Sequence, residues 1–576
     1  MRLLRPTDAL PYFNRDIEAQ NARISTRVLR MWRSLPRLKR TLLPMFFILF
    51  LFGVVYSFGS PLPAAQHSSA DLHEIEEINI NRKNLHEVPA EVPDLAGVDD
   101  NAIGAHDAAE ELSQEKFPKF AGPKNERQEA VAAAFKHAWA GYKEYAWGHD
   151  QLKPQSKGYS DWFDTGLTIV DSLDTAIIMG LENEVKEGTE WIHKELSFDK
   201  DRYVNLFEIT IRVLGGLLTN YHLTGDKSFI KKAEDLAGRL LVGFTSSKSP
   251  VPYSDVNLKT GSAKGPSWSG DSSLSEVTTL QLEFRDLSRV TGNKTYEVTT
   301  FTVSEHVHAI GCEEHGGLCD MFINAESGKF KQKTTITFGA RSDSYYEYLL
   351  KQWLQTGKKT QWLIDDYVKA MSSMDEKMVR LSEPNKLLYI GELLPPADSF
   401  SPKMDHLVCF LSGTLGLGVQ NGMPARHMEI AKGLAEACNA MYQTPTGLAP
   451  EIAYFNLLPG KKEDLSIKPL DAHCLLRPEA IEAWFYMYRF TGDKKYQEWG
   501  WKAFEAIEKY ARLAVGYSSV NNVKKIPVTY RDLMESFFLA ETLKYLYLLF
   551  DDDRELIPLD KWVFNTEGHP LPIYDH

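Results

Sequence analysis

The stretch LRPEAIEAWFYMYRFTGD, residues 476–493, combines the signals of a buried helix with those of a charged site. Its body is apolar and aromatic, whereas Glu479 and Glu482 occupy the predicted first turn of a helix, directly after an Arg-Pro pair. Carboxylates stabilise helix N-termini by interacting with the helix dipole, so each glutamate has an ordinary structural explanation. The repetition of this arrangement elsewhere in the chain favours a functional explanation.

The same pattern recurs in FEITIRVLGGLLTNYHLTGDKSFIKKA, SEVTTLQLEFRDLSRVTGNKTYEVTT and DSYYEYLLKQWLQTGKKTQWL. Each segment has an acid near a helix start, an apolar body, a Thr-Gly-Asp, Thr-Gly-Asn or Thr-Gly-Lys turn, and an amphipathic second helix. Units of roughly 60–70 residues built in this way are typical of stacked helix pairs, which form either an open solenoid or a closed ring. The repeated acids favour the ring, because it directs all of them toward one end of one cavity. We therefore predict an all-α fold, an α/α barrel of inner and outer helices.

The acids that this barrel would direct inward are here called the acidic cup: Glu208, Glu276, Asp343, Glu347, Glu479, Glu482 and Glu541. Like charges in a confined pocket must be neutralised by protons, by a cation or by paired arginines. Arg212, Arg341 and Arg477 follow or precede three of these acids closely in the sequence. Carboxylates beside aromatic faces suit glycoside hydrolysis, in which one carboxylic acid protonates the leaving oxygen and a second carboxylate activates water or attacks directly. A hard cation such as Ca²⁺ would also suit these oxygen ligands.

Several other functions are disfavoured. The formal net charge of −13 argues against a nucleic-acid-binding protein, whose domain normally carries a basic face. The sequence contains no GxSxG elbow, no Walker A loop and no GxGxxG motif.

The N-terminal region has a different character. Residues 42–58, LLPMFFILFLFGVVYSF, carry no charge and follow a basic segment, which predicts a membrane anchor with its N-terminal side in the cytoplasm. A cleaved signal peptide is the alternative, but roughly 40 residues precede the apolar run, which is long for an n-region. We expect a cytoplasmic tail at 1–41, a single-pass type II anchor at 42–58, a disordered luminal stem at 59–122 and the α/α-barrel domain at 123–576.

The five cysteines suit the oxidising compartment that this topology implies. HAIGCEEHGGLC, with Cys312 and Cys319, resembles a zinc site superficially, but its spacing fits no common finger and a local disulfide is the preferred interpretation. One glycosylation sequon begins at Asn293.

Six blocks of the sequence are specific enough to indicate a protein family. They are NLFEITIRVLGGL, FGARSDSYYEYLLKQW, DHLVCFLSGTLGLG, LLRPEAIEAWFYMYR, MESFFLAETLKYLYLLF and VFNTEGHPLP. In this order they resemble the signature blocks of glycoside hydrolase family 47, the class I α-1,2-mannosidases, over residues 135–573. The resemblance implies an (α/α)7 barrel. It also implies a calcium-dependent, inverting enzyme that removes α-1,2-linked mannose from high-mannose N-glycans.

The resemblance also assigns roles to residues. Glu479 matches the general base, whereas Glu208 and Asp343 match the other two catalytic acids, and which of these two delivers the proton stays open. Thr566 matches the threonine that binds Ca²⁺ directly. The resemblance assigns the waters around the ion to Glu276, Glu347, Glu479, Glu482 and Glu541. It places these residues against the substrate: Arg212, Glu276, Arg341, His406, Arg477, Phe537 and Glu541. Cys409 and Cys438 match the disulfide of the family, which leaves Cys474 unpaired.

Arg341 indicates a subtype. Endoplasmic reticulum members of the family carry an arginine at this position, where Golgi members have a smaller apolar residue, so we expect an enzyme of the endoplasmic reticulum membrane, with the early Golgi as the alternative. The expected reaction trims a nine-mannose glycan on glycoproteins to one eight-mannose isomer, within N-glycan maturation and glycoprotein quality control. Three alternatives remain: a Golgi-type enzyme with broader trimming, a lectin-like degradation factor, and a helical scaffold without activity.

Overall fold

The structure, a computed structural model, describes residues 117–267, 269–396 and 398–574. Its compact unit begins at Phe117. The predicted tail, anchor and stem up to residue 116 lie outside the described residues, so the anchor stays a prediction. Among the helices that are described, none has the length and apolar character needed to cross a bilayer.

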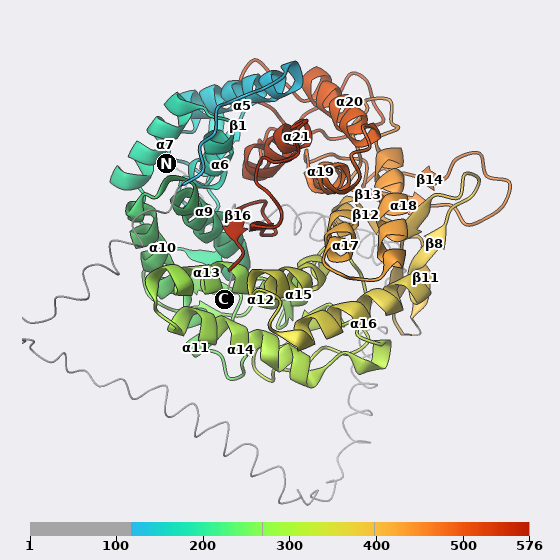
Figure 1. Ribbon diagram of the computed structural model, residues 1–576, viewed down its shortest axis with the longest axis horizontal. Coiled ribbons are helices and arrows are strands. Elements are labelled where there is room, and N and C mark those ends of the chain that lie inside the picture. Colours follow the sequence, from blue (N-terminus) through green and yellow to red (C-terminus); the bar gives the residue numbers. More distant parts are fainter. Residues whose placement is uncertain (1–116, 268, 397, 575–576) are drawn as a thin grey trace, which may run out of the picture. The chain divides into compact units, whose positions relative to one another are not determined.

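Seven buried helices form an inner ring in the described part of the chain (Figure 1). They are α6 (Leu167–Ile178), α9 (Gly215–Thr224), α13 (Gln281–Thr291), α15 (Asp343–Gln355), α17 (Phe410–Gln420), α19 (Glu479–Thr491) and α21 (Leu543–Leu549). Each inner helix contacts the next one, and α21 contacts α6, which closes the ring. The expectation of a helical barrel is therefore confirmed.

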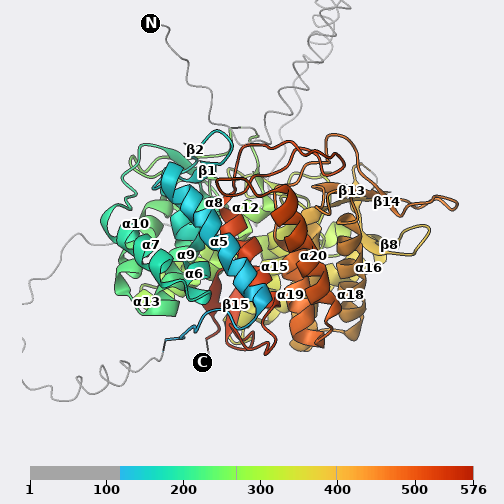
Figure 2. The ribbon, with the colours of Figure 1, turned by 90° about the horizontal axis from the view of Figure 1, so that it is seen from above.

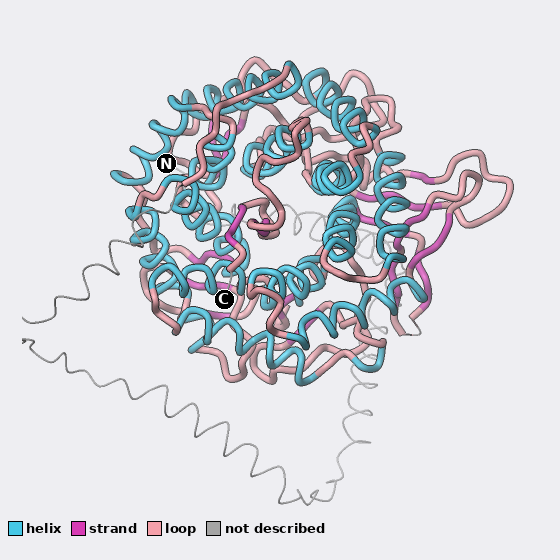
Figure 3. The backbone as a smooth tube through the Cα atoms, viewed as in Figure 1, coloured by secondary structure: helices cyan, strands magenta, loops and turns pink. Residues whose placement is uncertain are grey.

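Each inner helix also contacts a longer outer helix (Figure 3). The outer helices are α5 (Glu126–Tyr145), α7 (Glu182–Lys194), α10 (Lys227–Leu240), α14 (Thr295–Ile310), α16 (Gln361–Lys377), α18 (Ala425–Met441) and α20 (Lys495–Tyr510). Six inner helices pair with the outer helix that follows them, whereas α21 pairs with α5, the first helix of the barrel. The two ends of the barrel sequence thus meet in one helix pair.

The sequence explains which helices are inside. In α19, all residues from Ala480 to Tyr488 are buried, because the helices α17, α18, α20 and α21 pack around this helix. In α10, Phe229, Ala233 and Leu236 are buried at helical spacing, while the intervening lysines are not. This one-sided pattern is that of a helix with one face in water.

The predicted turns between inner and outer helices are present. Gly225, Gly292 and Gly492 all adopt the left-handed conformation that ends a helix. The Asp that follows can then cap the next helix, since Asp226 Oδ1 accepts a hydrogen bond from the backbone N–H of Ser228 at 2.9 Å at the start of α10.

One predicted helix is broken in the structure. SEVTTLQLEFRDLSRVT folds into α12 (Leu274–Thr278) and α13, which begins at Gln281. The break lies at Thr279, whose φ of −116° and ψ of 61° are not helical. Glu276 therefore sits on a short helix of its own, at the head of the inner helix.

Short helical turns and short β-strands connect the long helices. The expectation of an all-α fold did not include these strands. The remaining helical turns are α8 (Leu206–Ile209), η2 (Thr210–Leu214), α11 (Val242–Thr245), η3 (Glu313–His315), η4 (His406–Cys409) and η5 (Phe538–Thr542). Three antiparallel hairpins pair β1 (Gln151–Lys153) with β2 (Gly158–Ser160), β8 (Val379–Leu381) with β9 (Leu388–Ile390), and β10 (Glu392–Leu394) with β11 (Ser399–Ser401). A further antiparallel pair joins β6 (Ser272–Ser273) to β7 (Phe322–Ile323), which lie far apart in the chain. Two three-stranded sheets contain β3 (Tyr203–Asn205), β4 (Asp255–Asn257) and β5 (Ala263–Lys264), and β12 (Lys403–Asp405), β13 (Ile452–Phe455) and β14 (Leu465–Ser466).

A last hairpin fills the middle of the ring. It consists of β15 (Trp562–Phe564) and β16 (Pro570–Pro572), which contact α9, α13 and α15. Figure 2 shows β15 toward one end of the barrel, whereas β1, β2, β13 and β14 lie at the other end. The turn between β15 and β16 carries Thr566 into the interior of the barrel.

Two disulfides are present. Cys312 pairs with Cys319, so the local disulfide is confirmed and the zinc alternative is excluded. Cys409 pairs with Cys438 and joins η4 to α18. Cys474 is a buried thiol.

Candidate active site

Glu479 is the first residue of α19, and its carboxylate belongs to a short polar chain. His406 Nδ1 lies 2.9 Å from Glu479 Oε2, and His406 Nε2 lies 3.1 Å from the hydroxyl of Tyr442. Burial raises the pKa of Tyr442 well above its ordinary value, so its hydroxyl stays protonated and can donate to His406. A neutral His406 that accepts this bond at Nε2 donates its Nδ1–H to Glu479. The carboxylate is thereby oriented from one side.

Two arginines border Phe537. The guanidinium groups of Arg212 and Arg477 each lie 5.8 Å from the centre of its ring. Arg477 Nε donates to Glu451 at 2.5 Å, and its Nη1 lies 3.9 Å from Glu479 Oε1. Phe537 is half-buried between these cations, which themselves contact Glu208 and Glu479, so its aromatic ring lies near two of the candidate acids.

Glu208 has a different environment. Its carboxylate accepts from Arg212 Nε at 3.0 Å, and its backbone N–H donates to the side chain of Asn205, which caps α8. Arg212 also makes an ion pair with Glu567 and lies 3.9 Å from Asp171. The Glu208 carboxylate therefore faces a guanidinium that it shares with two further acids.

Asp343 begins α15 and has no arginine partner of this kind. Ser275 Oγ donates to its Oδ1 at 2.9 Å, as does the backbone N–H of Ser344. Burial raises the pKa of Asp343 to about 7, and the charges of Glu347 and Glu479 act in the same direction. Asp343 thus holds a proton at a pH where an exposed aspartate would have lost it.

The rest of the acidic cup concentrates negative charge. Glu347 makes a buried ion pair with Lys351. Burial raises the pKa of Glu482 to about 8, although Lys351 opposes this effect. Burial likewise raises the pKa of Glu541, with further contributions from the nearby acids Glu567, Glu479 and Glu482. These carboxyl groups are close enough to repel one another when ionised.

Thr566 lies at the turn of the central hairpin, beside these acids. Its backbone N–H donates to the hydroxyl of Tyr348 at 3.3 Å. The turn is fixed by Asn565, whose side chain donates to the carbonyl of Ile211 at 2.9 Å and to Glu283 at 2.8 Å. Gly568 has a φ of 70°, and a Cβ there would lie 3.2 Å from Glu541 Cγ. The close approach of the turn to Glu541 therefore requires glycine.

Glu276 and Arg341 lie at the edge of this group of acids, since Ser275 next to Glu276 bonds to both Arg341 and Asp343. The Glu276 carboxylate accepts from the backbone N–H of Ser273 in a capping box and from Asn205 at 2.9 Å. Arg341 has a left-handed φ of 86°, and its guanidinium lies 5.5 Å from the ring centre of Phe322. Burial lowers the pKa of Arg341, and the charge of Glu276 opposes this effect. The two residues form a rim next to the acids.

The residues fit a hard cation held through oxygen. Within the described ranges, no group of three or more His, Cys, Asp or Glu side chains is arranged as direct metal ligands. The side chains gathered near Thr566 are instead carboxylates whose pKa values are raised by burial, and which a divalent ion would favour in their anionic form. Only oxygen ligands are offered, as Ca²⁺ prefers.

The sequence analysis missed several site residues. Glu567 stands next to Thr566 in a block that was recognised, so its position was a usable signal. Glu451 and Asp171 lie outside the recognised blocks, in a loop and in a helix that lacks an acid at its start, and no motif pointed to them.

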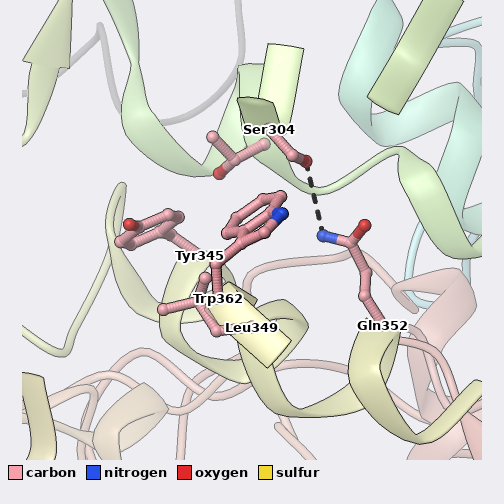
Figure 4. A pocket seen from close by; sticks show the side chains of 6 residues that line it. Ser304, Tyr345, Leu349, Gln352 and Trp362 are labelled. Atoms are coloured by element: carbon pink, nitrogen blue, oxygen red, sulfur yellow. Dashed lines mark hydrogen bonds between the residues drawn. The ribbon is translucent and has the colours of Figure 1, made fainter. Parts of the chain in front are cut away.

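Two of the small cavities in the described part of the chain differ in their relation to the site. One lies beside Glu479 and is lined by residues that include His406, Tyr442, Glu451 and Arg477. The other lies between α14, α15 and α16, where Gln352 donates to Ser304 at 3.4 Å near Tyr345, Leu349 and Trp362 (Figure 4). None of the predicted site residues lines this second cavity.

Several known proteins are similar to this chain in sequence or in fold. The model of glycosyl hydrolase family 47 matches residues 134–573. The endoplasmic reticulum mannosyl-oligosaccharide 1,2-alpha-mannosidase of Mus musculus is 54% identical over 466 residues, which cover 80% of this chain and 70% of that protein. The mannosyl-oligosaccharide alpha-1,2-mannosidase IA of Drosophila melanogaster is 43% identical over 460 residues, 78% of this chain and 67% of that protein. The solved alpha-1,2-mannosidase from Trichoderma reesei superimposes with a TM-score of 0.73 at 29% identity, covering 79% of this chain and 100% of that chain. The six sequence blocks, the closed barrel of helix pairs and these matches together show that the chain belongs to glycosyl hydrolase family 47.

Proposed function

We propose that this glycoside hydrolase removes α-1,2-linked mannose from high-mannose N-glycans on glycoproteins, with inversion at the anomeric carbon and in dependence on Ca²⁺. The observation that carries the proposal is the arrangement of three acids around the hairpin turn of Thr566. The charge of Glu479 acts on Asp343, and Arg212 joins Glu208 to Glu567, the neighbour of Thr566. The names of the similar proteins from Mus musculus and Drosophila melanogaster support the substrate class.

Glu479 acts as general base in this proposal. His406 and Arg477 orient its carboxylate from two sides, which leaves it ready to take a proton from an attacking water. Phe537 supports the mannose ring with its face, because sugar C–H groups pack on aromatic rings. Arg212 and Arg477 flank the Phe537 ring, so they can donate hydrogen bonds to the hydroxyls of a sugar packed on that ring.

Asp343 is the favoured proton donor. Its pKa of about 7 keeps a substantial protonated fraction at neutral pH, as a general acid requires. Glu208, in contrast, is paired with Arg212, and its carboxylate stabilises that guanidinium beside the substrate. The assignment thus follows from the difference between the two environments.

Thr566 would hold Ca²⁺ through its carbonyl and hydroxyl oxygens, and Glu347, Glu479, Glu482 and Glu541 would hold it through water. A bound Ca²⁺ supplies positive charge that offsets the repulsion among these acids and helps to fix the sugar hydroxyls and the attacking water. Glu541 and Gly568 keep the turn of Thr566 close to the acids.

Arg341 at the rim favours restricted trimming, from a nine-mannose glycan to one eight-mannose isomer. Its planar guanidinium can donate several hydrogen bonds at once and so select one glycan branch. The proposal places the barrel in the lumen of the endoplasmic reticulum, behind a single type II anchor at residues 42–58, where it would contribute to glycoprotein quality control. The two disulfides and the exposed sequon at Asn293 support an oxidising, glycosylating compartment.

The test is hydrolysis of a defined nine-mannose glycan by the purified full chain. We expect mannose release that a calcium chelator abolishes and that added Ca²⁺ restores, with β-mannose as the first anomer. Glu479→Gln should lower kcat at least about 100-fold, the usual lower bound for a lost general base, while the chain still folds and binds the glycan. Glu498→Gln, at an exposed glutamate on outer helix α20, is the matched control and should keep full activity. Glycan binding without release at any calcium concentration would identify a lectin instead.

A further inference from the structure

Four charged side chains are completely buried beneath the candidate site. They are Asp171 and Asp174 on α6, Lys544 on α21, and His569 at the end of the hairpin turn, and we call them the anchor cluster. None belongs to the acidic cup, and the proposed reaction does not use them directly. Burying charges is unfavourable unless their partners are well placed, and apolar residues of similar volume often give equal or greater stability. Stability alone therefore does not account for the anchor cluster.

One end of the anchor cluster holds the hairpin turn. Lys544 Nζ donates to Asp174 Oδ2 and to the backbone carbonyl of Gly568, both at 2.6 Å. His569 Nδ1 lies 3.0 Å from Asp174 Oδ2. The lysine thus ties the main chain two residues after Thr566 to α6 and α21.

The other end reaches Arg212. His569 Nε2 lies 3.2 Å from Asp171 Oδ1, and the second oxygen of Asp171 faces Arg212 Nη1 at 3.9 Å. This second oxygen is buried and has no hydrogen-bond partner of its own. Arg212 in turn pairs with Glu208 and with Glu567, the neighbour of Thr566. A continuous polar chain therefore joins Lys544 to the Glu208 carboxylate.

We propose that the anchor cluster is a positioning unit, which fixes the Thr566 turn for cation binding and couples that turn to the Arg212–Glu208 pair. The inference rests on the proposed function, since it assigns a calcium-binding role to Thr566. It predicts that Ca²⁺ affinity depends on residues that never touch the ion, as is common for groups that orient metal ligands.

Lys544→Met tests this inference, because methionine has a similar volume and no charge. The probe is Ca²⁺ alone, titrated calorimetrically into the full chain, with thermal unfolding in chelator as the measure of fold. We expect the Kd for Ca²⁺ to rise at least about 10-fold, the lower range for changes to groups behind metal ligands. Arg285→Met is the matched control, since Arg285 is a buried cation of the same barrel that binds Glu297, Gln352 and Gln355 away from the turn. It should destabilise the fold and leave the Kd unchanged.

A second variant separates the effect on the position of the Thr566 turn from the effect on the stability of the fold. Asp174→Asn with Lys544→Met removes both charges of one pair, so that no unpaired charge stays buried, and serves if the single variant does not fold. The double variant should also show a higher Kd for Ca²⁺ than the unmodified chain. A wild-type Kd in a folded Lys544→Met or double variant overturns the inference, as does an equal loss of affinity in Arg285→Met. If the unmodified chain binds no Ca²⁺, the proposed calcium dependence is what fails, and this inference falls with it.

Discussion

The carboxyl groups of Glu208 and Asp343 differ in their surroundings, because Glu208 is paired with Arg212 whereas burial dominates at Asp343. Because Asp343 has a pKa of about 7 and Glu208 faces Arg212, we predict that the Asp343 proton gives the alkaline limb of the rate–pH profile. The wild-type kcat should fall as pH rises above about 7, since the donor is then lost. Asp343→Asn should lower kcat by at least about 100-fold and abolish that limb. The measurement is kcat against pH at saturating Ca²⁺, with Glu208→Gln as comparison. Retention of the alkaline limb in Asp343→Asn would show that another group donates the proton.

Arg341 combines a strained backbone with a position at the rim of the site. A left-handed conformation costs a non-glycine residue of order 1 kcal/mol or more, and such costs persist where the surroundings or the function demand them. We predict that Arg341→Leu broadens the products from one eight-mannose isomer to several smaller glycans, because the hydrogen bonds that select a branch are lost. Product mapping by chromatography is the measurement. Arg554→Leu is the control, since Arg554 is exposed and has a similar φ of 60°. An unchanged single isomer in Arg341→Leu would refute the assignment.

Single residues also show which side chains of the candidate site a sequence pattern can indicate and which it cannot. Glu479 was identified as a site candidate because it follows Arg-Pro at the head of an apolar helix, where a carboxylate stands out. Glu451 reaches Arg477 from the loop before β13, and loops carry no periodicity that predicts which side chain will point inward. Glu276 stood out for the same reason as Glu479, yet its carboxylate caps its own short helix.

At the level of elements, two inner segments depart from regular α-helix next to the site. The π-turns η2 and η5 carry Arg212 and Glu541 respectively. Such turns insert an extra residue into a helix and so re-aim the side chains around it, and they are frequent at functional sites. Helical periodicity predicted both helices but not these insertions, because one extra residue changes the apolar pattern very little.

The disulfide between η4 and α18 is expected to stabilise an element that bears a site residue. Cys409 follows His406 by one turn, and its bond to Cys438 spans 29 residues, whereas the bond from Cys312 to Cys319 spans only 7. A disulfide stabilises a protein mainly by restricting the unfolded chain, and more so when it closes a longer loop. Removal of the Cys409–Cys438 bond should therefore lower the free energy of unfolding by about 3.5 kcal/mol, and removal of the Cys312–Cys319 bond by about 2.5 kcal/mol. Denaturant unfolding of paired Cys→Ala variants measures both. A larger loss from the shorter loop would mean that contacts in the native state, and not loop length, decide the effect.

The closure of the barrel is a property of the whole molecule that local patterns did not contain. The repeats predicted helix pairs and a ring, but each repeat contributes its own inner and outer helix. In the structure, the seventh pair joins α21 to α5. Helix α5 ends at Tyr145 and α21 begins at Leu543, 398 residues later. The number of pairs was expected from the family resemblance, because no periodicity could show that the first outer helix precedes its inner partner.

We expect the carboxyl groups gathered inside this ring to make the stability of the whole chain depend on pH and on calcium. Glu482 and Glu567 have folded pKa values of about 8, above the ordinary value of about 4.3, because burial disfavours their charged forms. Between these values the folded chain binds more protons than the unfolded chain, so the free energy of unfolding falls as pH rises. We predict that the chain in chelator loses thermal stability from about pH 5 to about pH 8, and that Ca²⁺ reduces this loss because it stabilises the ionised carboxylates. Thermal unfolding across this range in chelator, in Ca²⁺ and in Mg²⁺ is the measurement. The calcium-induced rise in Tm should therefore grow with pH, and a rise independent of pH would show that the ion binds away from these acids.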